Sequence, residues 1–324
     1  MAAERDATIS IIVPVFNEEA VLPQFYQRMT AALATIPDLS RWEILFVDDG
    51  SRDGTAVALT RLAASDARVR VLEFSRNFGH QIALTAGLDH ATGDAVVCID
   101  ADLQDPPEVV PALVQKWREG FEVVYGARAR RAHDSVFKRL SARLFYRLMQ
   151  RIGNIEIPLD AGDFRLLDRR AVEALRRIGE RHRFLRGLTV WIGYRRCGVP
   201  YERAERVAGV SKYPLREMVK LAWDAITSFS FAPLRLATYL GFLVSAGSIA
   251  VGILVIVARI MLPPESTVLG FPTHGWGSLM VALLFLGGVQ LIVLGMIGEY
   301  LGRTYDEVKR RPLYIIRRRL GSDG

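Results

Sequence analysis

The chain has 324 residues, half of them hydrophobic, a formal net charge of +7 and only 2 cysteines. Two cysteines exclude a disulfide framework, and Cys98, inside an apolar run, reads as a small core residue. The length allows one large domain with a smaller part, and the mean hydropathy of +0.18 is high for a soluble enzyme.

Strand-like and helix-like patterns alternate over the first ~130 residues. The expected strands are Thr8–Val15, Trp42–Val47, Val69–Phe74, Ala95–Asp100 and Glu122–Ala127. The expected helices are Glu18–Ala34, Thr55–Ala64, His80–His90 and Pro107–Glu119. This alternation predicts an α/β fold: a mostly parallel, Rossmann-like sheet with helices on both faces.

Polar residues follow each of the first four strands. They are Asn17 and Glu18, Asp48 and Asp49, Ser75 to Asn77, and Asp100 to Asp102. Ligands of such sheets bind beyond the carboxyl ends of the strands, so a ligand site is expected at this edge.

The fourth of these stretches, Asp100 to Pro107, indicates a metal-diphosphate site. Asp100 and Asp102 lie two residues apart at a strand end and project to the same side. Their repulsion is relieved by a hard divalent cation such as Mg²⁺ or Mn²⁺, which keeps positions open for phosphates. Asp105 and the two prolines are expected only to end the strand and begin the next helix.

Other polar residues fit either a ligand contact or a purely structural role. Asp49 is expected to contact a base or ribose, whereas Asp53 fits a turn or helix cap better. Asn17 could cap the first helix or, with Glu18, contact the ligand. Arg128 could reach the ligand edge, and Arg206 and Lys212 bracket a glycine-containing loop suited to phosphate. Each cation taken alone could also be a solvated surface charge.

Beyond the sheet, residues 131–190 are arginine-rich and mostly helical in pattern, with a strand expected at Asp163–Leu167. A strand or hairpin is expected within Gly193–Val207. The helix expected over Leu215–Phe231 fits an interfacial amphipathic helix or a plain core helix.

Two uncharged runs, Leu236–Ala258 and Trp276–Gly298, are each long enough to span a bilayer. The alternative is a pair of buried core helices. The loop between them lacks Lys and Arg while both outer flanks are basic, so both termini are expected in the cytoplasm. The predicted parts are a catalytic domain over 1–214, the juxtamembrane helix over 215–234, a membrane hairpin over 235–299 and a basic tail over 300–324.

Several classes are disfavoured. No signal peptide is expected from the charged N-terminus. No dinucleotide fingerprint, P-loop or hydrolase elbow is present. The positive charge concentrates in the tail, where attraction to anionic lipid explains it more simply than nucleic acid does.

A set of motifs in fixed order resembles one family. The motifs are Val13–Glu19, Val47–Thr55, Asn77–Gln81, Asp100–Pro107, Gly162–Arg165 and Arg206–Tyr213. The chain is similar over its whole length to family 2, GT-A-type glycosyltransferases of the polyisoprenyl-phosphate branch. Its two expected spans favour the undecaprenyl-phosphate glucosyltransferases of the GtrB type over four-span dolichol-phosphate mannose synthases.

The resemblance implies roles for individual residues. Metal ligands would be Asp100, Asp102 and Gln104. Nucleotide contacts would fall on Pro14, Phe16, Asn17, Glu18, Val47, Asp49 and Ala101. Phosphates would meet Arg128, Arg206 and Lys212, and the lipid phosphate would meet Arg165 and Ser211. The family often has Tyr where Phe16 stands, so stacking is kept and a hydroxyl contact is lost.

The resemblance also implies the reaction: inverting transfer of a sugar from a nucleotide diphosphate sugar to a polyprenyl phosphate at the cytoplasmic face of the plasma membrane. Glucose from UDP-glucose is expected, with mannose from GDP-mannose or an amino sugar as alternatives. A processive polysaccharide synthase is disfavoured because no Gln-x-x-Arg-Trp motif occurs. An inactive membrane scaffold is disfavoured by the intact acidic motif. A homo-oligomer, a tetramer by resemblance, is expected.

Overall fold

The structure is a computed structural model that describes residues 7–39, 41–128, 161–181, 183–203 and 276–321, with scattered positions between 234 and 272. It divides into two compact units. The sheet unit comprises Met1–Ala225 and Arg311–Gly324, and the second unit comprises Ile226–Arg310. Each unit is described by itself.

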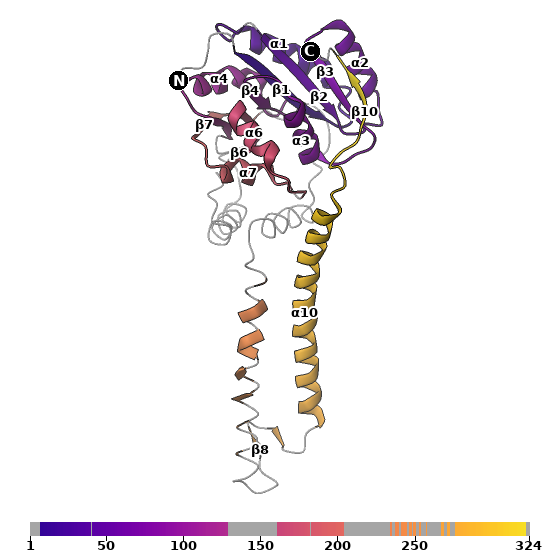
Figure 1. The fold of residues 1–324 in the computed structure, drawn as a ribbon, viewed down its shortest axis with the longest axis vertical. Coiled ribbons are helices and arrows are strands. Elements are labelled where there is room, and N and C mark those ends of the chain that lie inside the picture. The colour runs from indigo at the N-terminus through magenta and orange to yellow at the C-terminus, as the bar shows by residue number, and fades with distance from the viewer. Residues whose placement is uncertain are drawn as a thin grey trace. The chain divides into compact units, whose positions relative to one another are not determined.

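The described part of the sheet unit holds an eight-stranded sheet in the order β10-β3-β2-β1-β4-β6-β5-β7 (Figure 1). Its strands are β1 (Thr8–Val15), β2 (Arg41–Asp48), β3 (Val69–Phe74), β4 (Ala95–Cys98), β5 (Val123–Arg128), β6 (Ala161–Asp168), β7 (Arg196–Tyr201) and β10 (Ile316–Leu320). Strands β3, β2, β1 and β4 run parallel, and so do β5 and β7. Strand β6 runs antiparallel to β4 and β5, and β10 antiparallel to β3, so the sheet is mixed.

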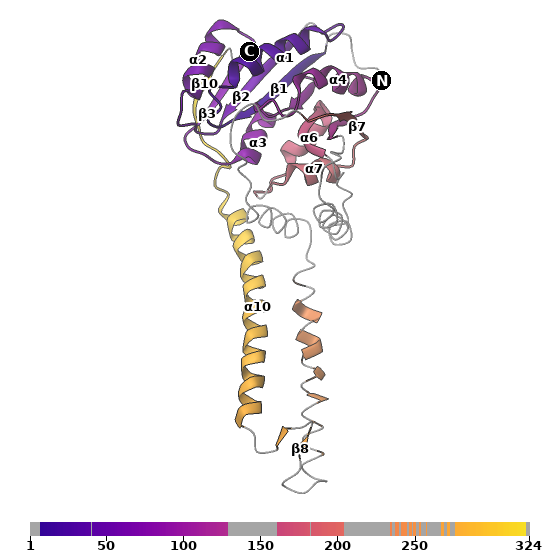
Figure 2. The same ribbon diagram turned by 180° about the vertical axis from the view of Figure 1, so that it is seen from behind.

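Helices cover both faces of this sheet, as the alternating pattern predicts (Figures 1 and 2). They are α1 (Leu22–Ala34), α2 (Thr55–Ser65), α3 (His80–His90), the 3-10 helix η1 (Pro107–Val109), α4 (Val110–Arg118), α6 (Arg169–Arg177) and α7 (Leu185–Trp191). Apolar residues of α1, α2 and α4 form one core cluster with alternate residues of β1 and β2. Helix α3 packs on the opposite face, where Gly87 lies so close to Ile12 that a β-carbon would clash.

The near-continuous burial of β1, β2 and β4 follows from this two-sided cover. A parallel strand between two helical layers has no solvent face and therefore reads as an unbroken apolar run. Cys98 is 3% exposed at the end of β4, and burial raises the pKa of its thiol to about 12. Its predicted role as a core residue is confirmed.

The second unit contains α10 (Trp276–Lys309) and a short hairpin of β8 (Thr267–Val268) and β9 (Phe271–Pro272). Within α10, Phe285–Lys309 is apolar and long enough to cross a membrane, and its apolar side chains such as Leu291 and Leu294 are exposed. The predicted span over 236–258 has only scattered described residues, which are helical. The span therefore stays a prediction. The predicted helix over 215–231 lies entirely outside the described residues.

Candidate active site

The functional edge of the sheet is where β1, β2, β3 and β4 end, because parallel strands bring their carboxyl ends together. The antiparallel β6 delivers its first residues to the same edge, since Arg165 pairs with Cys98 and Asp163 lies beyond it. Strands β5 and β7 end there with Arg128 opposite Tyr201. One edge thus collects residues from seven strands that are far apart in sequence.

The loops after β1 and β2 are locked together by reciprocal hydrogen bonds. The Asn17 side chain accepts from the Arg52 amide at 2.8 Å, and the Asn17 amide donates to Ser51 Oγ at 3.0 Å. The Glu18 amide donates to Thr55 Oγ1 at 2.9 Å. Asn17 has a positive φ of 56°, which Asn tolerates better than most residues. Helix α1 begins only at Leu22, so Asn17 binds the neighbouring loop instead of capping a helix.

Asp49 anchors the start of α3. Its two carboxylate oxygens accept the Phe78 and Gly79 amides at 2.6 and 2.9 Å, and the side chain is almost fully buried. Burial raises the pKa of Asp49, and the two amide donors offset part of that effect. The residue predicted to contact the nucleotide therefore also fixes the chain that follows β3.

Asp53 matches the turn reading. Its carboxylate accepts the Thr55 amide at 3.0 Å at the start of α2 and the Glu19 amide at 3.4 Å. Pro14 and Val47, also predicted nucleotide contacts, are buried register partners in β1 and β2, and Phe16 lies half-buried just beyond.

The acidic turn after β4 carries Asp100, Asp102 and Gln104. Asp102 Oδ1 accepts the Gln104 amide at 3.1 Å, and between them Leu103 is fully buried with a positive φ of 59°. A branched apolar residue in this conformation is strained, and its burial holds it there. Ala101 is buried at the strand end, so the turn points its polar residues outward.

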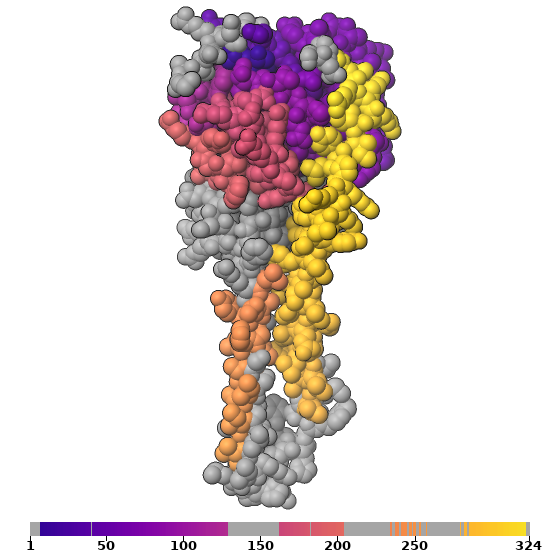
Figure 3. Space-filling view, in the orientation of Figure 1, coloured from indigo at the N-terminus to yellow at the C-terminus, as the bar shows by residue number. Residues whose placement is uncertain are grey.

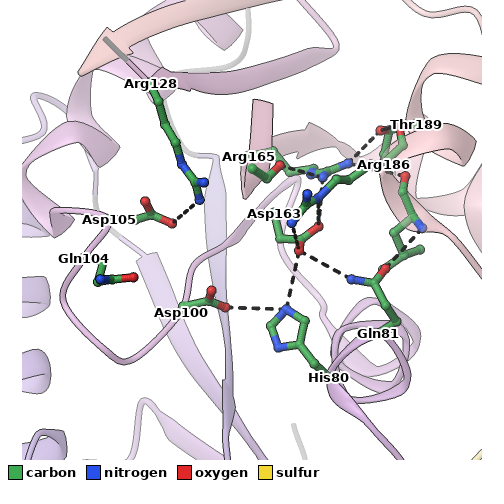
Figure 4. A network of polar contacts seen from close by, with 12 residues as sticks. His80, Gln81, Asp100, Gln104, Asp105, Arg128, Asp163, Arg165, Arg186 and Thr189 are labelled. Carbon is green, nitrogen blue, oxygen red and sulfur yellow. Dashed lines mark hydrogen bonds and ion pairs between the residues drawn. The ribbon is translucent and has the colours of Figure 1, made fainter. Parts of the chain in front are cut away.

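His80 bridges this turn to Asp163. Its Nε2 lies 3.6 Å from Asp100 Oδ1 and 3.6 Å from Asp163 Oδ2 (Figure 4). Burial disfavours the charged imidazole, but the two carboxylates outweigh it and raise the pKa of His80 to about 9. Burial, opposed by His80 and reinforced by neighbouring carboxylates, raises the pKa of Asp100 to about 6.

Asp163 is the centre of a buried ionic network. Arg186 donates to both of its oxygens at 3.1 and 2.8 Å, and Arg165 donates to Oδ1 at 3.1 Å. Although burial opposes ionisation, these arginines and His80 hold the pKa of Asp163 well below its usual range. Gln81 contributes a further contact at 3.4 Å and also accepts the Leu185 amide (Figure 4).

Arg165, the predicted lipid-phosphate residue, is only 7% exposed. Besides Asp163 it donates to the Gly162 carbonyl, Thr189 Oγ1 and the Leu185 carbonyl at 2.8, 2.7 and 3.3 Å. Its donors thus stabilise the junction of β6 and α7, and its predicted phosphate contact remains a prediction.

A second network surrounds Asp105, which is 2% exposed. The Tyr201 hydroxyl donates to Asp105 Oδ1, and Arg128 and Arg203 lie 3.9 and 3.8 Å from its carboxylate oxygens. Arg203 also donates to the side-chain oxygen of Gln104. Asp105 therefore does more than end a strand: it holds two cations beside the acidic turn.

The donor set of the acidic turn fits a hard divalent cation. Asp100 and Asp102 offer carboxylate oxygens and Gln104 an amide oxygen, the ligand types that Mg²⁺ and Mn²⁺ prefer. Burial raises the pKa of Asp100, and the neighbouring carboxylates raise it further, so a cation would relieve both effects. Among the described residues no three His, Cys, Asp or Glu side chains are grouped so that they could hold a metal ion.

The structure thus gathers most of the predicted site residues at one edge. Arg206, Ser211 and Lys212 lie outside the described residues. Sequence patterns do not single out Arg186 or Tyr201, they give Asp105 only a strand-ending role, and they include His80 and Asp163 only within longer motifs. The run from Gly162 to Arg165 was a signal, but only the antiparallel direction of β6 shows why it matters.

A mixed, GT-A-like sheet with an acidic turn and cations at its carboxyl edge fits a glycosyltransferase, and the comparisons with known proteins show that class. The chain belongs to glycosyl transferase family 2, whose family model matches residues 10–176.

Two relatives resemble it over nearly their whole length. An uncharacterized glycosyltransferase of Bacillus subtilis, YkcC, is 46% identical over 98% of this chain and 95% of the relative. The SfII prophage-derived bactoprenol glucosyl transferase of Shigella flexneri is 46% identical over 96% of this chain and 97% of the relative. The solved structure of glucosyl-3-phosphoglycerate synthase from Mycobacterium tuberculosis is 23% identical, with a TM-score of 0.49 over 68% of this chain and 76% of that one.

Proposed function

We propose that this chain transfers glucose from UDP-glucose to a polyprenyl phosphate, with inversion at the anomeric carbon and with Mg²⁺ or Mn²⁺ as cofactor. The observation that carries the proposal is the pairing of the acidic turn at Asp100 and Asp102 with cations held next to it. The 46% identity to a bactoprenol glucosyl transferase supports the lipid acceptor and the sugar. GDP-mannose or an amino-sugar donor is the alternative.

The donor is expected over the loops after β1 and β2, with contacts from Phe16, Asn17, Glu18 and Asp49. The locked pair of loops supports this, because a preformed surface loses little entropy on binding. Asp100, Asp102 and Gln104 would hold the metal, which neutralises charge on the departing diphosphate when bound. Arg203 donates to the Gln104 oxygen, which leaves one lone pair of that amide oxygen for the metal.

Arg128 is the best-supported diphosphate contact within the described residues. It is 32% exposed and is oriented by Asp105 and by the Tyr201 hydroxyl, 3.3 Å from its Nε. A guanidinium held in one orientation binds phosphate oxygens without first losing side-chain freedom. Arg206 and Lys212 are proposed to complete the cationic surface.

The acceptor phosphate needs no strong general base. Its second pKa is near ~6, so it is largely ionised at neutral pH. The protein must instead hold two anions, the donor diphosphate and the acceptor phosphate, close together. Cationic side chains in fixed positions can do this by offsetting their mutual repulsion. Arg165 and Ser211 are the proposed lipid-phosphate residues. Asp163 binds both Arg165 and Arg186 and would hold the Arg165 guanidinium in place.

An acceptor embedded in lipid explains why a chain of this class carries α10, whose apolar stretch can cross a bilayer. We propose a location in the plasma membrane, with a second span over 236–258, both termini in the cytoplasm, and assembly as a homo-oligomer.

Asp102→Asn tests the site. The variant is expected to fold and remain in membranes but to make no lipid-linked sugar when incubated with UDP-glucose, a short polyprenyl phosphate and Mg²⁺ or Mn²⁺. Product is measured by mass spectrometry of the lipid fraction, and the same assay with GDP-mannose separates the two donors. Wild-type activity of Asp102→Asn would disprove the metal assignment, and activity undiminished by a chelator would do the same.

A further inference from the structure

The chain beyond α10 returns to the sheet. Residues 311–321, here the C-terminal segment, include β10, which pairs antiparallel with β3 as an edge strand. In the space-filling view the yellow residues of this segment lie along the purple edge of the sheet unit (Figure 3). Gly321 has a φ of +92°, and a β-carbon there would come within 2.5 Å of the Val69 carbonyl, so the contact is close.

Tyr314 makes the most specific contacts of this segment. Its ring stacks on Phe74 at 5.2 Å between centroids, with an interplanar angle of 16°. Its hydroxyl donates to Asp89 Oδ2 at 3.0 Å, which joins β3 to the far end of α3. The next residue, Ile315, accepts the Ser75 amide through its carbonyl at 2.9 Å.

These contacts lead directly to the candidate site. Residues 75–79, here the β3–α3 segment, follow β3 and end where His80 begins α3. Phe78 packs edge-on against Phe74, with 5.5 Å between the ring centroids. Tyr314 stacks on the same Phe74, so this ring connects the two. The same Phe78 donates its amide to Asp49, and His80 lies 3.6 Å from Asp100.

We propose that Tyr314 is a positioning residue for the donor site. Together with the Ile315 carbonyl it fixes the β3–α3 segment from the side opposite to Asp49, so that Asp49 and His80 keep their places. A loop held by few contacts opens locally at low free-energy cost, and each added contact lowers the population of open forms. The link to donor binding rests on the proposed function, whereas the restraint on the segment does not.

The test uses the full-length protein in detergent micelles and the variants Tyr314→Phe and Tyr314→Ala. Phe keeps the ring stack and loses the hydroxyl, with its hydrogen bond to Asp89 and its contact to His90 Nε2 at 3.4 Å, whereas Ala loses the ring and the hydroxyl. Tyr194→Phe is the matched control, because within the described part of the chain that hydroxyl makes one long hydrogen bond, to the Arg170 carbonyl at 3.5 Å. Amide hydrogen exchange of residues 75–80 is measured without nucleotide, followed by titration with UDP and Mn²⁺.

Loss of the hydrogen bond is expected to speed exchange of residues 75–80 about two- to tenfold in Tyr314→Phe. Tyr314→Ala is expected to speed it further, and Tyr194→Phe to leave it unchanged. UDP affinity should fall by a similar factor while the KM for polyprenyl phosphate stays constant, a split that general destabilisation would not produce. If Tyr314→Ala does not fold, Tyr314→Phe carries the test.

Unchanged exchange of residues 75–80 in the folded Tyr314 variants would overturn the inference, as would faster exchange with full UDP affinity. If the wild-type protein binds neither UDP nor GDP, the proposed function fails. The hydrogen-exchange data still test, independently of nucleotide binding, whether Tyr314 restrains residues 75–80.

Discussion

The hydrogen bond from Tyr201 to Asp105 allows a sharp test of how the cations beside the acidic turn are held. Tyr201→Phe removes the hydroxyl and keeps the ring, which packs edge-on against Phe164 at 5.6 Å. Burial and the Asp105 charge raise the pKa of Tyr201, so the hydroxyl remains a donor at neutral pH. A hydrogen bond to a charged group contributes about 1.5 to 3 kcal/mol.

For a folded unit as large as the sheet unit, losing about 1.5 to 3 kcal/mol of stability lowers the melting temperature by about 3 to 12 °C. The fall is measured by tryptophan fluorescence during heating of detergent-solubilised protein. A double-mutant cycle with Asp105→Asn isolates the pair, since Tyr201→Phe should cost much less once the charged acceptor is gone. The same cost in both backgrounds would refute the reasoning. The KM for the donor should rise in Tyr201→Phe, because Arg128 loses a support.

Two further predictions concern the loops. Gly50→Ala should cost about 1 to 3 kcal/mol, because Gly50 has a φ of +71° and a β-carbon would lie 2.5 Å from the Arg76 backbone. Gly179→Ala is the control in the same melting assay, because an added β-carbon there would meet no atom of the described residues within 4 Å apart from its chain neighbours, and equal effects would argue against the strain. Asp66 is bound by Arg68, which lowers the pKa of Asp66 to about 2 despite opposing burial. The pKa of Asp66 is lower in the folded chain than in the unfolded chain, so its carboxylate stabilises the fold at neutral pH and this stabilisation is lost as pH falls from about 4 towards about 2. Wild type should therefore melt at a higher temperature than Asp66→Asn near neutral pH, and the two melting temperatures should converge over that range. A difference that persists at the lowest pH would contradict this.

The sheet and its ligand edge could be predicted because the strands there are uniformly apolar and end in polar residues. Strands β1 and β3 and helix α3 occupy the ranges expected from the pattern. Helix α1 starts four residues later than expected, since the chain from Asn17 to Glu19 is bound to the loop after β2.

The networks at the site could not be predicted, because hydropathy carries no information on strand direction. A parallel β6 would place Asp163 at the opposite edge, away from Asp100. Strand β10 was missed for another reason: its three consecutive arginines show no alternation, and Glu73 of β3 pairs with two of them. The same residues read as a basic tail when no partner strand is known.

The place of β10 in the chain has a consequence for biogenesis. Synthesis runs from the N-terminus, so β10 leaves the ribosome only after the whole of α10 has been made. Until then β3 is an open edge with unpaired backbone groups, the kind of edge that recruits other strands. A fragment ending before the apolar helix would keep that edge permanently, and should aggregate more readily than the full-length chain.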